Sequence, residues 1–173
     1  MSRGAPCPPS ASVVEMNELL LPGHANALNT AFGGQIMAWV DICAAMAAQR
    51  HAREVVVTAA MDAVTFIAPI KVGQVVNLRG MVNATWRTSM EVGVRVESED
   101  PLTGIRTHVL SAYLTFVTID HEGRPIAVVP VVPETSVETL RYREALARRA
   151  TRLQLAQERQ RLQDAHDSDA SPR

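Results

Sequence analysis

One long apolar helical pattern limits most strongly what this chain can fold into. From Gly34 to about Gln49 apolar residues recur with the period of an α-helix, and Asp41 is the only acidic residue there. Arg50 and His51 follow, where positive charge favours a helix C-terminus. A helix that is apolar on nearly all sides must be covered on several of them. The rest of the chain is therefore expected to wrap around this helix.

The segments around the helix have the two-residue period of β-strands. A first strand is expected over Val13 to Leu21, before the helix. Four strands are expected after it, over residues 54–66, 75–86, 90–97 and about 106–119. This order predicts an α+β fold and not the alternating order of a parallel sheet. We predict a curved antiparallel sheet wrapped around the helix. Since the other face or an edge of that sheet would need a partner chain, we expect an oligomer.

Composition divides the chain into four parts. Residues 1–11 are rich in proline and small residues and are expected to form a disordered leader, and residues 164–173 a disordered tail. The folded domain is expected over 12–133. An arginine-rich C-terminal helix is expected over 134–163, starting at Glu134 or Thr135. It carries seven arginines against two glutamates between Arg141 and Arg161. These arginines either form a solvated face of a packed helix or bind a polyanionic ligand at a protomer junction.

The overall composition excludes several classes of protein. The chain has 173 residues, of which 47% are apolar and 20% charged, which indicates one globular domain. The net charge of −1 gives no reason to expect nucleic acid or a membrane as partner. Two cysteines, Cys7 and Cys43, predict neither a disulfide framework nor a cysteine metal site. We expect a cytoplasmic protein without a signal peptide or membrane span.

Asp41 is the strongest candidate for chemistry. A carboxylate in an apolar helix faces a desolvation cost unless it is paired, hydrogen-bonded or near water, and such surroundings tune acids and bases. The alternative is a surface aspartate that only touches solvent.

The approach to the helix suggests a second element of a site. Gly33 and Gly34 leave free backbone N–H groups at the positive end of the helix dipole, which suits a carbonyl oxygen that becomes negative in a transition state. Taken alone, the pair is equally consistent with a tight turn. Asn26, in the preceding loop, offers a neutral hydrogen-bond donor or is simply a turn residue.

Other catalytic patterns are missing from the sequence. The five histidines have no metal-ligand spacing, so no metal site is expected. There is no Gly-x-Ser-x-Gly elbow, phosphate loop or dinucleotide fingerprint.

An ordered series of short motifs extends from about Val13 to Pro130 and resembles the hotdog-fold acyl-CoA thioesterases, the cytosolic acyl-CoA hydrolase family. The ordered series is far more specific than any one of its motifs. In order they are His24-Ala25-Asn26, Phe32 to Asp41, Arg50-His51, Val57 to Asp62, Phe66 to Ile70, Val72-Gly73, Thr88 to Val92 and Thr115-Phe116-Val117.

The resemblance implies a fold, an activity and a shared site. The fold is a long helix wrapped by an antiparallel sheet, in homodimers that commonly assemble further, to a trimer of dimers. The activity is hydrolysis of acyl-CoA to a free fatty acid and CoA, without a metal or redox cofactor. The catalytic pair falls on Asn26 and Asp41, from opposite protomers. Asp41 would be general base or nucleophile, and Asn26 with the backbone near Gly33 and Gly34 would polarise the thioester carbonyl.

The resemblance also suggests contacts with CoA, and it leaves rivals. Thr58, Arg87, Thr88 and Ser89 are predicted to bind CoA, although Arg87 fits an exposed strand end equally well. An enoyl-CoA hydratase is disfavoured because Met46 stands where that class pairs a histidine with the aspartate. The remaining rival is a non-catalytic protein that binds acyl-CoA as a sensor or regulator.

Overall fold

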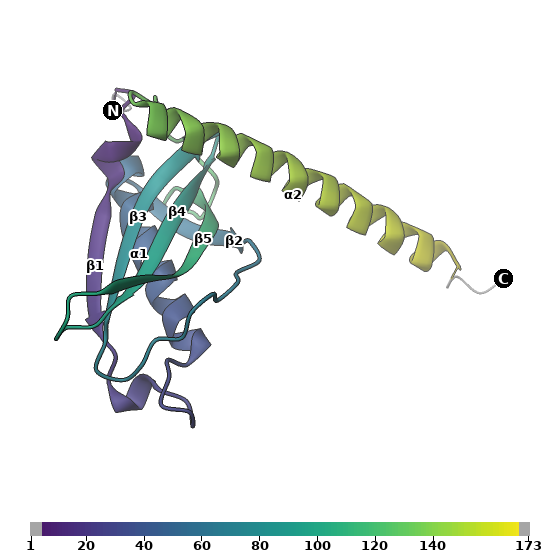
Figure 1. Cartoon of the computed structure of the whole chain (residues 1–173). Coiled ribbons are helices and arrows are strands. Elements are labelled where there is room, and N and C mark those ends of the chain that lie inside the picture. The colour runs from purple at the N-terminus through teal and green to yellow at the C-terminus, as the bar shows by residue number, and fades with distance from the viewer. Residues whose placement is uncertain (1–4, 170–173) are drawn as a thin grey trace.

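The computed structural model describes residues 5–169, and the order of its elements follows the predicted sequence of one strand, a long helix and four strands. A five-stranded antiparallel sheet has the strand order β1-β3-β4-β5-β2, so β1 and β2 are its edges (Figure 1). The elements are the short 3-10 helices η1 (Pro9–Ser12) and η2 (Pro22–His24), the strands β1 (Val14–Leu19), β2 (Val55–Met61), β3 (Val75–Thr85), β4 (Ser89–Glu99) and β5 (Arg106–Ile119), and the helices α1 (Gly33–Ala52) and α2 (Ser136–Asp169).

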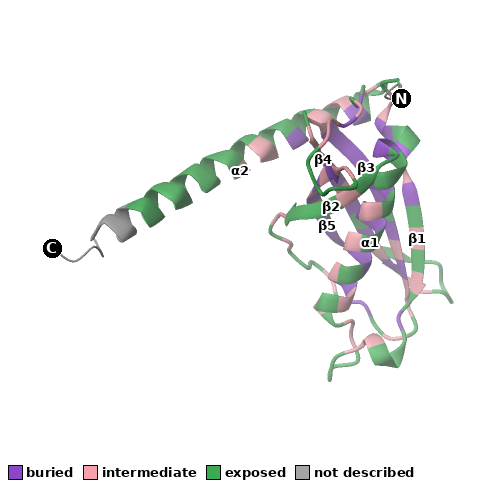
Figure 2. Ribbon diagram, turned by 180° about the vertical axis from the view of Figure 1, so that it is seen from behind, coloured by how far each residue is buried: buried purple, intermediate pink, exposed green. Residues whose placement is uncertain are grey.

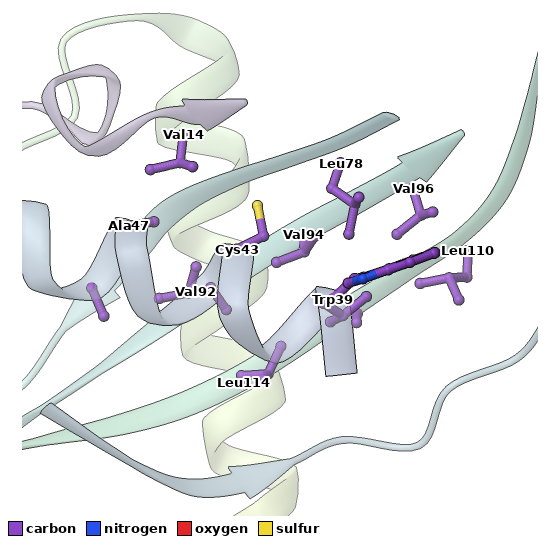
Figure 3. Packing of buried hydrophobic residues seen from close by; sticks show 14 of the residues in the cluster. Val14, Trp39, Cys43, Ala47, Leu78, Val92, Val94, Val96, Leu110 and Leu114 are labelled. Carbon is purple, nitrogen blue, oxygen red and sulfur yellow. The ribbon is translucent and has the colours of Figure 1, made fainter. Parts of the chain in front are cut away.

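The core lies between α1 and one face of the curved sheet. Buried side chains of α1, among them Trp39 and Cys43, pack against inward-facing valines and leucines of β3, β4 and β5 (Figure 3). The close approach depends on Gly80, since a Cβ there would lie 3.1 Å from Cys43 Sγ. Burial raises the pKa of the Cys43 thiol to about 11, only partly opposed by a hydrogen bond with the Gly80 backbone. At neutral pH Cys43 is therefore a protonated, apolar packing residue.

The opposite face of the sheet is covered in part by the first half of α2. Figure 1 shows α2 crossing the sheet near one end and then extending away from the body. Beyond the body, its residues up to Asp164 are almost all exposed (Figure 2). The helix starts with a reciprocal cap. Glu138 N–H donates to Thr135 Oγ1 at 3.2 Å, and Thr135 N–H donates to Glu138 Oε2 at 3.0 Å. The start therefore coincides with one of the two that the sequence allowed.

Regular structure begins before residue 12 and continues beyond residue 163, the two outer boundaries expected from the sequence. Residues 1–4 and 170–173, parts of the expected leader and tail, lie outside the described residues. Within the rest of the leader, Pro9–Ser12 forms η1, and Ser10 N–H donates to the Glu138 carboxylate at 3.0 Å. At the other end α2 continues to Asp169, because no helix-breaking residue occurs before Pro172.

None of the helices in the described part of the chain is long and apolar enough to cross a membrane.

Candidate active site

Asp41 lies in the third turn of α1, half-buried, on the side of the helix that faces the edge strand β2. The Thr58 hydroxyl, from β2, donates a hydrogen bond to Asp41 Oδ1 at 2.8 Å. One carboxylate oxygen is thus held by a neighbouring strand. Among the described residues the other oxygen has no hydrogen-bond partner, so it is available to a water molecule or substrate. A carboxylate fixed through one oxygen and open at the other can accept a proton.

Asn26 lies in the loop before α1, and its side chain is held by that loop. Its Oδ1 accepts hydrogen bonds from Leu28 N–H at 2.9 Å and Thr30 N–H at 3.3 Å. Its Nδ2 donates to Thr30 Oγ1 at 3.0 Å. An amide nitrogen carries two hydrogens, so one N–H of the exposed Asn26 is left for a ligand. The loop also contains Asn29, the other asparagine near the helix, which has a left-handed backbone at φ 55° and serves the turn.

The predicted groups form two separate clusters within one chain. Gly33 and Gly34 are the first residues of α1, so their N–H groups stand free at its N-terminus, on the same side as the Asn26 loop. Asp41 is seven residues further along than Gly34, which corresponds to roughly 10 Å along the helix axis. No hydrogen bond joins Asn26 to Asp41 within residues 5–169. One small carbonyl group cannot contact both clusters of the same chain.

An apolar hollow of about 380 Å³ opens beside the start of α1. It is bounded by Gly33 and Ile36 of the helix and by the segment between β2 and β3, including Phe66 and Ile67. Phe66 and Ile67 are strongly exposed for their type, at 46% and 62%. A hollow of this kind accommodates a hydrocarbon chain better than a charged group.

Arg87, Thr88 and Ser89 form the tight connection between β3 and β4 and the start of β4. The carbonyl groups of Arg87 and Thr88 accept hydrogen bonds from Val128 and Thr118 N–H, so the turn is fixed by its backbone. Arg87 is exposed, whereas Ser89 lines a groove of about 740 Å³ between the sheet and α2. The structure does not bring these three residues into contact with Asp41 or Asn26 in the same chain.

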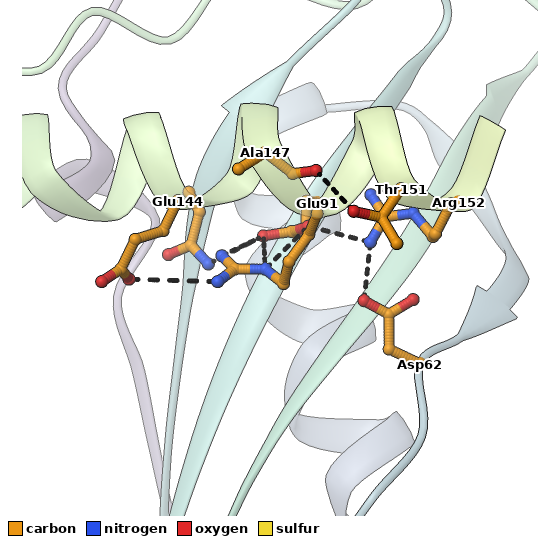
Figure 4. A network of polar contacts seen from close by, with 8 residues as sticks. Asp62, Glu91, Glu144, Ala147, Thr151 and Arg152 are labelled. Carbon is orange, nitrogen blue, oxygen red and sulfur yellow. Dashed lines mark hydrogen bonds and ion pairs between the residues drawn. The ribbon is translucent and has the colours of Figure 1, made fainter. Parts of the chain in front are cut away.

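A buried charge network that sequence reasoning missed holds α2 on the sheet (Figure 4). Glu91 of β4 is 0% exposed. Arg148 donates to its carboxylate at 2.7 Å, and Arg152 donates both to Glu91 at 3.1 Å and to Asp62 at 2.7 Å. Arg148 also lies 3.6 Å over the Tyr113 ring. Burial opposes the charge of Arg148, but its hydrogen bond to Glu91 and the attraction of that carboxylate outweigh this and raise its pKa.

The two-residue period over residues 90–97 places Glu91 on the face opposite the buried valines of β4. That period does not show that α2 covers this face and buries Glu91. The arginine excess of the C-terminal helix was the available signal for this contact, although 57 residues separate Arg148 from Glu91.

The sheet order and the central helix wrapped by that sheet define a hotdog fold, and comparison with known proteins assigns it to the thioesterase class. The family model described as Thioesterase superfamily matches residues 28–105. The chain is 37% identical over 158 residues to an uncharacterized acyl-CoA thioester hydrolase of Bacillus subtilis, YkhA, across 91% of this chain and 92% of that protein. This chain therefore belongs to the thioesterase superfamily, among its acyl-CoA thioester hydrolases.

Solved structures give the same assignment. An apo-hexameric acyl-CoA thioesterase is 41% identical, with a TM-score of 0.84 over 87% of this chain and 97% of that one. The acyl-CoA hydrolase of Staphylococcus aureus, solved with butyryl coenzyme A, coenzyme A and coenzyme A disulfide, is 36% identical, with a TM-score of 0.80 over 91% and 99%. That enzyme was also solved with an aspartate, an asparagine or a threonine replaced by alanine. The chain spans about a quarter to a third of the length of the mammalian relatives it matches.

Proposed function

We propose that this protein hydrolyses acyl-CoA to a free fatty acid and CoA, with Asp41 as the general base. The observation that carries the assignment is the Asp41 carboxylate, held by Thr58 at 2.8 Å in a helix with no other acidic residue. The spacing in the S. aureus enzyme supports it. There the substituted aspartate follows the asparagine by 15 residues and precedes the threonine by 17, as Asp41 does with Asn26 and Thr58.

The proposed reaction uses both clusters. The thioester carbonyl accepts hydrogen bonds from Asn26 Nδ2 and from the free N–H groups at Gly33 and Gly34. Asp41 takes a proton from a water molecule while the water oxygen bonds to the carbonyl carbon, and the negative charge that forms on the carbonyl oxygen is stabilised by these donors. The C–S bond then breaks, the electron pair leaves with sulfur, and the thiolate of CoA takes up the proton from Asp41. The apolar hollow beside Gly33 receives the acyl chain.

We propose that the two clusters of one site come from two chains, and the separation of about 10 Å along one helix supports this. The edge strand β2 is suited to pairing with a second copy, because it exposes backbone groups together with Val55 and Val57. The α1 residues Ile42 and Met46 are also exposed, at 49% and 38%. A two-fold axis through β2 would run the two α1 helices antiparallel and bring the start of one near Asp41 of the other. We propose this homodimer as the catalytic unit.

The same proposal extends to the oligomeric state, the cofactor requirement, the location and the contacts with CoA. We place three such dimers in a hexamer, since a relative of 41% identity is an apo-hexameric acyl-CoA thioesterase. The chemistry requires only water, a carboxylate and hydrogen-bond donors, so we propose that it proceeds without a metal or redox cofactor. We also propose that the protein acts in the cytoplasm. Thr58, Arg87, Thr88 and Ser89 remain our candidates for contact with CoA, Thr58 through the same hydroxyl that holds Asp41.

Replacement of the proposed base tests the assignment. Asp41→Asn keeps the shape and a hydrogen-bonding group but cannot accept the proton, so kcat for butyryl-CoA should fall by about 10²- to 10⁴-fold. The control is Glu15→Gln, a similar change on the exposed opposite edge strand, which should keep wild-type activity. Near-normal turnover by Asp41→Asn would remove Asp41 from the mechanism. If the wild-type protein binds butyryl-CoA but releases no thiol, the protein is an acyl-CoA sensor instead.

Mixing two inactive variants tests the shared site. Asn26→Ala and Asp41→Ala proteins, exchanged at equal amounts, should regain about a quarter of the wild-type sites, because half the dimers are hybrids with one intact site each. The control is each variant exchanged with itself. Hybrids that form but stay inactive would contradict a site built from two chains.

A further inference from the structure

The edge strand β2, which carries Thr58, is paired within one chain on one side only, with β5. Its residues 57–60 are exposed, and Val56 and Met61 are the two that pack against the core. The pairing with β5 shifts register between Thr58 and Ala60. An extra residue of this kind interrupts the ladder and bends the strand. The position of Thr58 therefore depends on how the end of β2 beyond this bulge is fixed.

Asp62, the residue after β2, is held in two ways (Figure 4). Its N–H donates to the Tyr113 carbonyl oxygen at 3.0 Å, and its carboxylate accepts a hydrogen bond from Arg152 of α2 at 2.7 Å. Both side chains of this ion pair are 22% exposed, so water screens it less than a pair on the open surface. The same nitrogen, Arg152 Nη1, donates to the buried Glu91 carboxylate at 3.1 Å. Arg152 thus connects the end of β2 to the middle strand of the sheet, β4.

These contacts form a continuous path from α2 to the proposed catalytic base. Asp62 follows Thr58 by four residues, and the Thr58 hydroxyl donates to Asp41 Oδ1 at 2.8 Å. We propose that Arg152 is a positioning residue for hydrolysis, which fixes the end of β2 through Asp62 and so keeps the Thr58 hydroxyl on Asp41. This inference rests on the proposed function of Asp41, and it makes the C-terminal helix part of what orients the active site.

Arg148 gives the comparison that separates positioning from anchoring of α2. It donates to the same buried Glu91, at 2.7 Å, and its side chain is exposed to the same extent as that of Arg152, 22%. Its other ion pair is with Glu144 of α2 itself, and among the described residues it has no ion pair with Asp62. Replacing Arg148 therefore loosens α2 without releasing Asp62. A loss of activity caused by a loose helix would occur in variants of both arginines.

Steady-state hydrolysis of butyryl-CoA tests the proposal. In Arg152→Gln kcat should fall by about 3- to 10-fold with KM unchanged, since the loss is limited to the roughly 10-fold expected for removing the Thr58 hydroxyl. Arg152→Lys keeps a cation for Asp62 and should lose less. Arg148→Gln, the matched control, should keep kcat within about 2-fold of the wild type. Equal losses in Arg152→Gln and Arg148→Gln would overturn the proposal, as would a rise in KM at constant kcat.

A double-mutant cycle shows whether Arg152 acts through Thr58. The Thr58→Val protein has no hydroxyl left to position, so adding Arg152→Gln to it should cause no further fall in kcat. An effect of Arg152 on stability alone would be independent of the hydroxyl, and the two losses would then multiply. Multiplied losses would refute the path through Thr58.

Backbone hydrogen exchange separates this proposal from the proposed function, because it requires no turnover. In Arg152→Gln the amides of β2 around Thr58 should exchange about 10-fold faster than in the wild type, whereas in Arg148→Gln their rates should stay the same. If the wild type releases no thiol from butyryl-CoA, the proposed function fails, and this measurement still decides whether Arg152 holds β2. Unchanged exchange in Arg152→Gln would overturn the inference.

Discussion

Removing the charge of Glu91 should destabilise the protein more than any comparable change on the sheet surface. In Glu91→Gln the carboxylate that receives Arg148 and Arg152 is lost from a position that is 0% exposed. Breaking a fully buried ion pair costs about 3–5 kcal/mol. Both arginine side chains keep 22% exposure and Arg152 keeps Asp62, so we expect a loss of roughly 2–3 kcal/mol. For a chain of this length that corresponds to a fall in Tm of about 5–10 °C.

The measurement is urea unfolding and thermal melting at one fixed protomer concentration, because subunit association also contributes to stability. Glu97→Gln is the control, since Glu97 lies on the same strand and pairs with the exposed Arg95, and it should cost less than about 1 kcal/mol. Replacing both Glu91 and Arg148 by methionine should recover part of the loss, because an apolar pair leaves fewer buried charges unmatched. A Glu91→Gln protein as stable as Glu97→Gln would refute the anchoring role of the network.

Three further outcomes follow from the structure. Burial would raise the pKa of Glu138, but three backbone N–H donors, including that of Ser10, outweigh burial and lower this pKa. The charged carboxylate therefore stabilises the fold at pH values above its unfolded pKa of about 4.3. This contribution is lost as the pH falls through the lower pKa of the folded state. Glu138→Gln should therefore lower Tm at pH 7 and weaken its fall under acid conditions, and an unchanged acid profile would contradict the capping role. Thr58→Val should reduce kcat about 10-fold by releasing the Asp41 carboxylate, while Thr58→Ser should retain most activity, and equal loss in both would point to packing instead. Activity should persist after dialysis against EDTA, and loss that zinc or magnesium restores would overturn the proposal of metal-free hydrolysis.

The central helix and the strands could be predicted because their patterns are local. The helical period around Val40 and the alternation along β4 each depend on neighbouring residues, and both agree with the structure. The order of the strands in the sheet and the position of α2 depend on contacts between distant segments. Alternation tells which face of a strand is polar, but it does not tell whether a later helix covers that face, and so the burial of Glu91 was missed.

The candidate site was predictable to a similar degree. Asp41 could be singled out because one acid in an apolar helix is conspicuous in a single sequence. Thr58 was expected to contact CoA, and its hydrogen bond to Asp41 could not be foreseen, since it depends on how β2 lies beside α1. The separation of Asn26 from Asp41 within one chain required both the helix length and the position of the loop.

Because α2 is attached to the sheet through its first half, a small tilt of that half displaces the outer half by a larger distance. Among the side chains that the structure describes, Arg152 is the last on α2 to pair with the body, and the helix continues for another 17 residues to Asp169, about 25 Å. A tilt of about 10° at the anchor would move that end by about 4 Å and Arg159 by less than half as much, in proportion to its distance along the axis. Small changes at Glu91 or Asp62 are therefore amplified with distance. Their effect should be seen first as a broader distribution of distances between labels on α2 and on the sheet.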